Sequence, residues 1–152
     1  MDTRQAQARV TMRRVDDLFA RYAESHRDPR NKAIHWVCVP LITWSMLAIL
    51  WWASPVAAYV LIGVAMLFYL RLSIAIAIGM LGVTALMVFP LTQLGDATLP
   101  VAIAVFVAAW VGQFVGHRIE GKKPSFVEDV RFLLVGPAWL LGDFYRRVGI
   151  RY

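Results

Sequence analysis

Three histidines, His26, His35 and His117, are the side chains of this sequence that are best suited to chemistry. Two of them stand just before a long apolar block, and the third stands where that block ends. Glu120 follows His117 by three residues, a spacing that places both side chains on one helix face and that metal-binding helices use. Imidazoles with a carboxylate suit Fe²⁺, Zn²⁺ or Mn²⁺. The pattern therefore predicts one metal site that contains all three imidazoles.

Two amides, Asn31 and Gln113, lie near these histidines. Gln113 stands within apolar sequence, where a polar residue is a candidate for function. A single histidine at a membrane edge is usually solvated or hydrogen-bonded, so the prediction depends on all three lying at one edge. The single cysteine, Cys38, excludes an intrachain disulfide and a cysteine-based metal cluster. The sequence contains no phosphate loop, dinucleotide fingerprint or nucleophile–base motif.

The composition is that of an integral membrane protein. Hydrophobic residues make up 59% of the 152 residues and charged residues 17%, against about 45–50% and about 25% in soluble domains. Between Trp36 and Gly116 the only charged side chains are Arg71 and Asp96. The net charge of +6 is explained by Lys and Arg beside cytoplasmic loops and anionic lipid headgroups, so no nucleic-acid partner is expected.

Four apolar segments predict an all-α, polytopic membrane bundle with about four spans. They cover residues 36–53, 56–70, 72–91 and 99–115, each close to the roughly 17–25 residues that a spanning helix needs. The expected breaks are Ser54-Pro55, Arg71 and residues 92–100. We expect one membrane-embedded domain, residues 1–152, in which residues 1–35 precede the spans, 36–116 form them, and 117–152 form a cytoplasmic or interfacial tail. Gly112 and Gly116 form a G-x-x-x-G pattern that predicts close helix packing.

The flanking segments are predicted to lie at the membrane surface. Residues 2–24 predict a basic amphipathic helix in the headgroup plane, because Val15, Leu18, Phe19 and Tyr22 follow helical spacing. Residues 25–32 predict a loop, since Asp28-Pro29 is a turn signal. Residues 132–141 are apolar but too short to span, and Gly136-Pro137 interrupts them, so an interfacial or re-entrant element is expected.

The distribution of charge predicts the topology. With four spans and the N-terminus inside, all sixteen Lys and Arg fall on the inner side, as the positive-inside rule requires. Both termini are therefore expected in the cytoplasm, with the histidine site on the cytoplasmic side. The expected location is the bacterial inner membrane, or the endoplasmic reticulum in a eukaryote.

Two motifs resemble a known family, the 2-hydroxy fatty acid dioxygenases, over essentially the whole chain. The first is Y-x-x-S-H-x-x-x-x-N-x-x-x-H-x-x-x-x-P, at Tyr22, Ser25, His26, Asn31, His35 and Pro40. The second is W-x-x-Q-F-x-G-H-x-x-E-x-x-x-P, at Trp110, Gln113, Phe114, Gly116, His117, Glu120 and Pro124. Members are small membrane proteins of fungi and bacteria.

The resemblance implies an Fe²⁺-dependent enzyme that uses O₂ to convert a 2-hydroxy fatty acid into a fatty acid one carbon shorter, with CO₂ and water. It implies that His26, His35 and His117 bind iron, with Glu120 as a further ligand or a partner of the ligands. Asn31 and Gln113 would orient the ligands or the substrate. The acyl chain would lie in the bilayer along residues 36–53 and 99–115. The sequence is compatible with an oligomer.

Two alternatives remain at this stage. One is a zinc-dependent lipid hydrolase that uses Glu120 as the base acting on a metal-bound water. The other is a metal-binding membrane protein without enzymatic activity, whose histidines only tie the ends of the chain to the bundle. The identity of the bound metal and a requirement for O₂ separate these alternatives from the dioxygenase.

Overall fold

The computed structural model describes residues 13–123 and 131–152, and these residues form helices joined by short connections. The elements are, in chain order, α2 (Arg14–Ala23), α3 (Pro29–Ala53), α4 (Pro55–Leu72), α5 (Ile74–Leu94), the 3₁₀ turn η1 (Gly95–Ala97), α6 (Thr98–Glu120) and α7 (Phe132–Arg147). The described residues contain no strand. The all-α prediction is confirmed.

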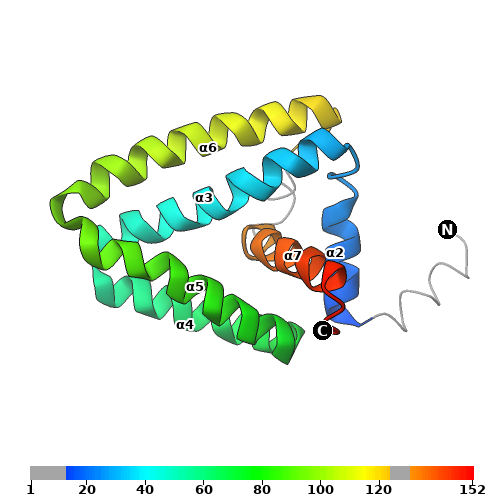
Figure 1. Ribbon diagram of the computed structural model, residues 1–152, viewed down its shortest axis with the longest axis horizontal. Helices are drawn as coiled ribbons and strands as arrows, with labels where there is room; N and C mark the ends of the chain where they lie inside the picture. The colour runs from blue at the N-terminus through cyan, green and yellow to red at the C-terminus, as the bar shows by residue number, and fades with distance from the viewer. Residues whose placement is uncertain (1–12, 124–130) are drawn as a thin grey trace, which may run out of the picture.

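Three helical stretches are long and apolar enough to span a membrane: Pro29–Ala53, Pro55–Leu72 and Ile74–Glu120. The third stretch is 47 residues long because it includes α5, η1 and α6, and the chain changes direction at η1 (Figure 1). These apolar helices indicate a membrane protein. Four spans, a single domain and cytoplasmic termini stay predictions.

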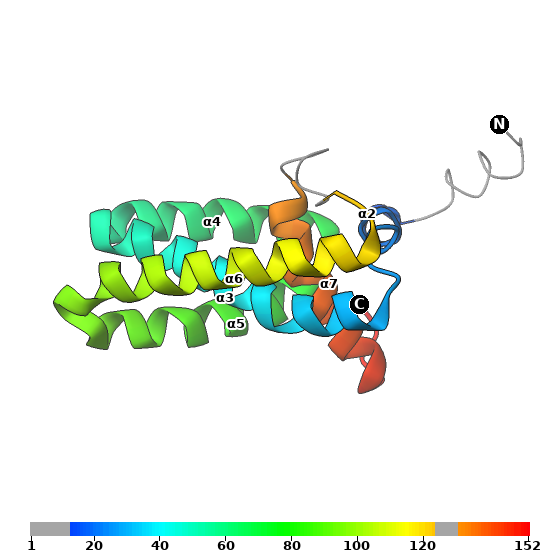
Figure 2. The same cartoon turned by 90° about the horizontal axis from the view of Figure 1, so that it is seen from above.

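The long helices form two layers. Helix α3 packs along α6, and α4 packs along α5. The two pairs converge at the end that contains η1 and diverge toward the other end, where α7 lies between them (Figure 1). Seen from above, α7 crosses the direction of the long helices (Figure 2). The beginning of α3 and the end of α6 therefore meet at the same end of the bundle as α2 and α7.

Helix α2 packs onto the protein itself. Its predicted apolar stripe, Val15, Leu18, Phe19 and Tyr22, is buried. The stripe belongs to a core cluster with residues of α7 such as Val135 and Trp139. The prediction of an amphipathic helix is confirmed for Arg14–Ala23, but its apolar face contacts α7 instead of lipid. The remainder of the predicted helix, residues 2–12, lies outside the described residues.

Three predicted boundaries need correction. The predicted loop over residues 25–32 ends at Asp28, because the Asp28 carboxylate caps α3 by accepting from the Arg30 amide at 2.8 Å and Pro29 occupies the first helical position. The break predicted at Arg71 lies at Ser73, whose hydroxyl caps α5. Gly136-Pro137 does not interrupt α7, which is continuous over 16 residues.

The G-x-x-x-G prediction is confirmed, because both glycines face α3. A Cβ atom at Gly112 would lie 2.6 Å from the Cys38 sulfur. One at Gly116 would lie 2.5 Å from the Asn31 side-chain oxygen. Ordinary carbon contacts begin near 3.4 Å, so only glycine permits this helix spacing. The close contact sets the distance between the helices that carry His35 and His117.

Candidate metal centre

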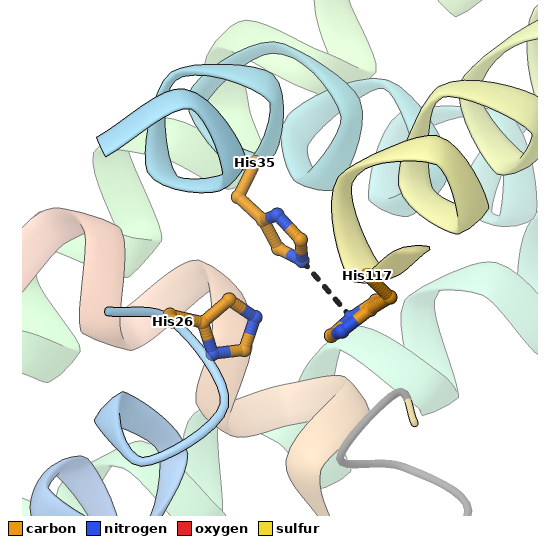
Figure 3. A group of neighbouring side chains, drawn as sticks. All are labelled: His26, His35 and His117. Carbon is orange, nitrogen blue, oxygen red and sulfur yellow. Dashed lines mark hydrogen bonds between the residues drawn. The ribbon is translucent and has the colours of Figure 1, made fainter. Parts of the chain in front are cut away.

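The three histidines come from three segments and converge at the open end of the bundle (Figure 3). His26 lies in the connection between α2 and α3, His35 lies in the second turn of α3, and His117 lies in the last turn of α6. Their exposed fractions are 1%, 0% and 3%. The candidate ligand nitrogens all lie within 4.8 Å of one another. The structure therefore brings together the three residues that the sequence predicts as ligands.

Backbone carbonyls fix two of the rings. His26 Nδ1 donates to the Tyr22 carbonyl at 2.6 Å, and His35 Nδ1 donates to the Asn31 carbonyl at 2.9 Å. Each bond joins a histidine to the residue four positions earlier. A proton on Nδ1 leaves Nε2 with a free lone pair, and this is how metal-ligating histidines are usually held. Both rings are thus held in the tautomer that binds a metal through Nε2.

Some ring nitrogens of the three histidines face one another or have no hydrogen-bond partner among the described residues. His35 Nε2 lies 3.2 Å from His117 Nε2 and 2.7 Å from the Gln113 amide nitrogen. His26 Nε2 and His117 Nδ1 are buried without a hydrogen-bond partner among the described residues. His26 Nε2 is thus a buried acceptor without a partner among the described residues, and an unsatisfied buried acceptor is costly. A cation between the three rings would satisfy it.

The donor set fits a divalent transition metal. Neutral imidazoles suit iron, zinc and copper. Metal–nitrogen distances of about 2.1 Å allow ligand nitrogens on one ion to lie up to about 4.2 Å apart, which is close to the 4.8 Å within which the three candidate ligand atoms lie. The His35 and His117 rings are nearly perpendicular, at 89°, and therefore approach the common point from different directions.

Glu120 does not join this cluster of nitrogens. One of its carboxylate oxygens accepts from the Arg27 amide at 2.9 Å. The other accepts from the Asp28 amide at 2.8 Å and from the Asn31 side chain at 3.1 Å. The carboxylate thus fastens the connection that contains His26 to the end of α6.

The two predicted amides occupy different places around the histidines. Asn31 is fully buried, and its amide also donates to the Ser25 carbonyl at 3.1 Å. Asn31 therefore joins the loop, α3 and Glu120, and its own carbonyl holds His35. Gln113 contacts His35 directly, and its side-chain oxygen has no partner among the described residues. Of the predicted polar residues, only Gln113 is in direct contact with a candidate ligand through its side chain.

Aromatic rings form one wall of the site. The Tyr22 ring stacks on His26 with centroids 4.2 Å apart and an interplanar angle of 14°, and Trp139 of α7 lies 5.6 Å from His26. Burial lowers the pKa of His26 below its ordinary value, which favours the neutral, metal-binding ring. Trp139 was not among the predicted site residues, because the sequence does not show where α7 packs. Pro124 of the second motif lies outside the described residues.

A cavity of about 380 Å³ reaches the site at His117 and extends into the bundle. His117, Gln113 and Tyr22 line one end of it, and side chains of α3, α4, α5, α6 and α7 line the remainder. A larger groove of about 950 Å³ lies between α2, the start of α3 and α7. Basic and aromatic residues such as Lys32, Arg146 and Trp36 line this groove, but none of the three histidines does. The smaller cavity is therefore the one that serves the candidate metal centre.

Comparison with known proteins gives a consistent result. The family model described as "2-hydroxy-palmitic acid dioxygenase Mpo1-like" matches residues 12–148. The chain is 27% identical, over 137 residues, to the 2-hydroxy-palmitic acid dioxygenase MPO1 of Saccharomyces cerevisiae, and the alignment covers 84% of this chain and 78% of the yeast protein. No solved structure matches the chain.

Proposed function

The chain belongs to the Mpo1-like family of 2-hydroxy-palmitic acid dioxygenases, and we therefore propose that it is an Fe²⁺-dependent dioxygenase acting on 2-hydroxy fatty acids. The proposed reaction converts the substrate and O₂ into a fatty acid one carbon shorter, CO₂ and water. The reaction is balanced without another reductant: oxidation of C1 to CO₂ releases one electron, oxidation of C2 to a carboxyl group releases three, and O₂ accepts all four.

The observation that carries this proposal is the geometry of the three buried imidazoles. The Tyr22 and Asn31 carbonyls hold the Nδ1 protons of His26 and His35, so Nε2 is the nitrogen of each ring that can bind a metal. These residues would hold the ion together with His117. When bound, an iron ion supplies the one-electron chemistry that lets O₂ react with an organic substrate. The family and the substrate's supply of four electrons favour iron over zinc.

The remaining residues of the site would hold the ligands and exclude water. Glu120 accepts three hydrogen bonds from the connection that contains His26 and from Asn31, so we assign it a positioning role. The Gln113 amide lies 2.7 Å from His35 Nε2 and also lines the cavity, so it would be placed to hydrogen-bond the 2-hydroxyl or carboxylate group of the substrate. The stacked Tyr22 and Trp139 rings close the site on the side of α7.

The position of the site suits a lipid substrate. His35 and His117 lie near the ends of the apolar helices α3 and α6, where a fatty acid carboxyl group would lie in a bilayer, and the cavity gives the hydrocarbon tail a place beside His117. The charge distribution supports cytoplasmic termini and a site on the cytoplasmic side, and it suits a bacterial inner membrane and an endoplasmic reticulum membrane equally. Labelling of cysteines introduced at the two ends of the chain, in sealed vesicles, tests that orientation.

One experiment tests the function. Protein purified without a His-tag and without oxygen is analysed for metals, and O₂ uptake is then measured with a 2-hydroxy fatty acid and with the same fatty acid lacking the hydroxyl group. We expect about one iron per chain, uptake only with the hydroxylated substrate, and loss of both iron and uptake in His117→Ala. Zinc at that stoichiometry with no O₂ uptake would favour a hydrolase. Absence of metal would favour a structural role for the histidines.

A further inference from the structure

The cavity beside the histidines is closed at its far end. Leu47, Ile62 and Met87 line it, and the same three residues belong to a packed cluster at the end of the bundle near η1. The packed partners beyond them include Ala58, Leu91 and Ala102, which are almost completely buried. These three lining residues therefore form a floor, beyond which the helices leave no room for a ligand.

The depth of the cavity matches the length of one lipid tail. His35 and Leu47 both lie on α3, and the rise between them is about 18 Å at 1.5 Å per residue. One leaflet of a bilayer has a hydrocarbon thickness of about 15 Å, which is half of the roughly 30 Å core. A tail that fills one leaflet would thus extend from the histidines to the floor.

Most of the lining is apolar, although Tyr69, Thr84, Trp110 and Arg131 also line the cavity. The methionines Met46, Met66, Met80 and Met87 line the cavity, and methionine adapts to flexible apolar ligands. Thr43 also lines it, but its hydroxyl donates to the Val39 carbonyl at 2.9 Å. The polar group nearest to the site end is Gln113, which contacts His35. The cavity thus has Gln113 and His117 at the site end and a mostly apolar lining elsewhere.

We propose that this cavity holds a single acyl tail with its carboxyl end at the histidines, and that Leu47, Ile62 and Met87 set the longest chain that the protein accepts. This inference rests on the proposed function, which identifies the polar group of the ligand as a 2-hydroxy carboxylate. It extends the expectation that the tail lies along α3 and α6, because α4 and α5 provide 8 of the 23 lining residues, including two of the three floor residues.

Deepening the floor should lengthen the preferred substrate. Met87→Ala removes the three side-chain atoms that follow Cβ, so the longest chain accepted should increase by about two to three carbons. The matched control is Leu86→Ala, because Leu86 immediately precedes Met87 on α5 and its side chain is 77% exposed. The measurement is kcat/KM across a series of 2-hydroxy fatty acids. The control should keep the wild-type profile.

Blocking the cavity halfway should have the opposite effect. Thr84 lines the cavity one turn of α5 nearer to the histidines than Met87. In Thr84→Phe, kcat/KM for long chains should fall by more than about tenfold, because each methylene kept out of an apolar site forfeits about fourfold in binding. Short chains that end before Thr84 should be unaffected. Leu86→Phe is the control for added volume on α5.

Photolabelling tests the inference without turnover and in the unaltered chain. A 2-hydroxy fatty acid of palmitoyl length with a diazirine at its methyl end should label the floor residues, and one with a diazirine at mid-chain should label residues near Met80 and Thr43. If both probes label lipid-facing residues such as Leu86 instead, or if Met87→Ala and Leu86→Ala share one chain-length profile, the inference is wrong. Depth-dependent labelling without O₂ uptake would support the cavity assignment and refute the dioxygenase function.

Discussion

Gly116→Ala tests whether the spacing of α3 and α6 builds the metal centre. The added Cβ would lie 2.5 Å from the Asn31 side-chain oxygen, 3.3 Å from an Ile34 methyl group and 3.5 Å from a carbon of the His35 ring. Asn31 cannot move aside easily, because its amide is bonded to both the Ser25 carbonyl and Glu120 and its side chain is fully buried. The two helices must therefore separate by several tenths of an ångström.

Gly116→Ala should lower both the folding free energy and the metal affinity, and the size of each loss can be worked out separately. Adding a methyl group to a well-packed contact costs about 1–3 kcal/mol of folding free energy. Metal–ligand distances tolerate only about 0.2 Å of error, and Asn31 is the residue whose carbonyl orients His35. Disturbing such a partner of a ligand lowers metal affinity by about 10- to 100-fold. We expect both losses in Gly116→Ala.

The assay combines anaerobic titration of metal-free protein with Fe²⁺ and thermal unfolding in detergent. Gly82→Ala is the matched control, because a Cβ there meets nothing within 4 Å and alanine is a better helix former than glycine by about 1 kcal/mol. The control should bind iron as the unaltered chain does and should melt no earlier. If Gly116→Ala has the same iron affinity and melting temperature as Gly82→Ala, the helix spacing does not set the metal site.

Three further predictions concern the ligands and their surroundings. His26→Ala, His35→Ala and His117→Ala should each abolish metal binding to a similar extent in elemental analysis, and a variant that retains full metal and activity would show that its histidine is not a ligand. Glu120→Gln should lower iron affinity by about tenfold, because an amide nitrogen cannot accept from the loop amides, whereas Glu24→Gln at an exposed position should not. Burial lowers the pKa of His26, so near pH 6.5 the unfolded chain binds a proton at His26 that the folded chain does not. Without added metal, the melting temperature of the protein should therefore be constant above about pH 7 and fall as the pH drops below about 6.5. A melting temperature that does not change over this range would contradict the assignment.

The sequence predicts the composition of the site well because its signals are local. Histidines at the two edges of an apolar block must meet if the block folds back on itself, and the G-x-x-x-G pattern at Gly112 and Gly116 indicates which helix faces touch. The hydrogen-bond partners of the rings also follow local spacing, since His26 and His35 each bond the carbonyl four residues earlier.

The role of Glu120 and the place of α7 depend on tertiary structure. The spacing of Glu120 from His117 puts both side chains on the same face of α6. The Glu120 carboxylate nevertheless accepts hydrogen bonds from backbone amides in the connection between α2 and α3. Gly136-Pro137 suggests a break, yet α7 continues because it is packed: a Cβ at Gly136 would lie 2.9 Å from the Tyr22 hydroxyl. Neither arrangement follows from periodicity, because each depends on which distant segment packs nearby.

The distance along the chain between the candidate ligands has a consequence for biosynthesis. His35 and His117 are 82 positions apart, so at about 5–20 residues per second a ribosome needs about 4–16 seconds to add the second after the first. Trp139, which covers His26, is added later still. A partly synthesised chain that has only α3 in the membrane therefore offers two of the three imidazoles. If the chain binds iron as proposed, metal loading would follow insertion of α6, because an interrupted chain lacks one of the three candidate ligands.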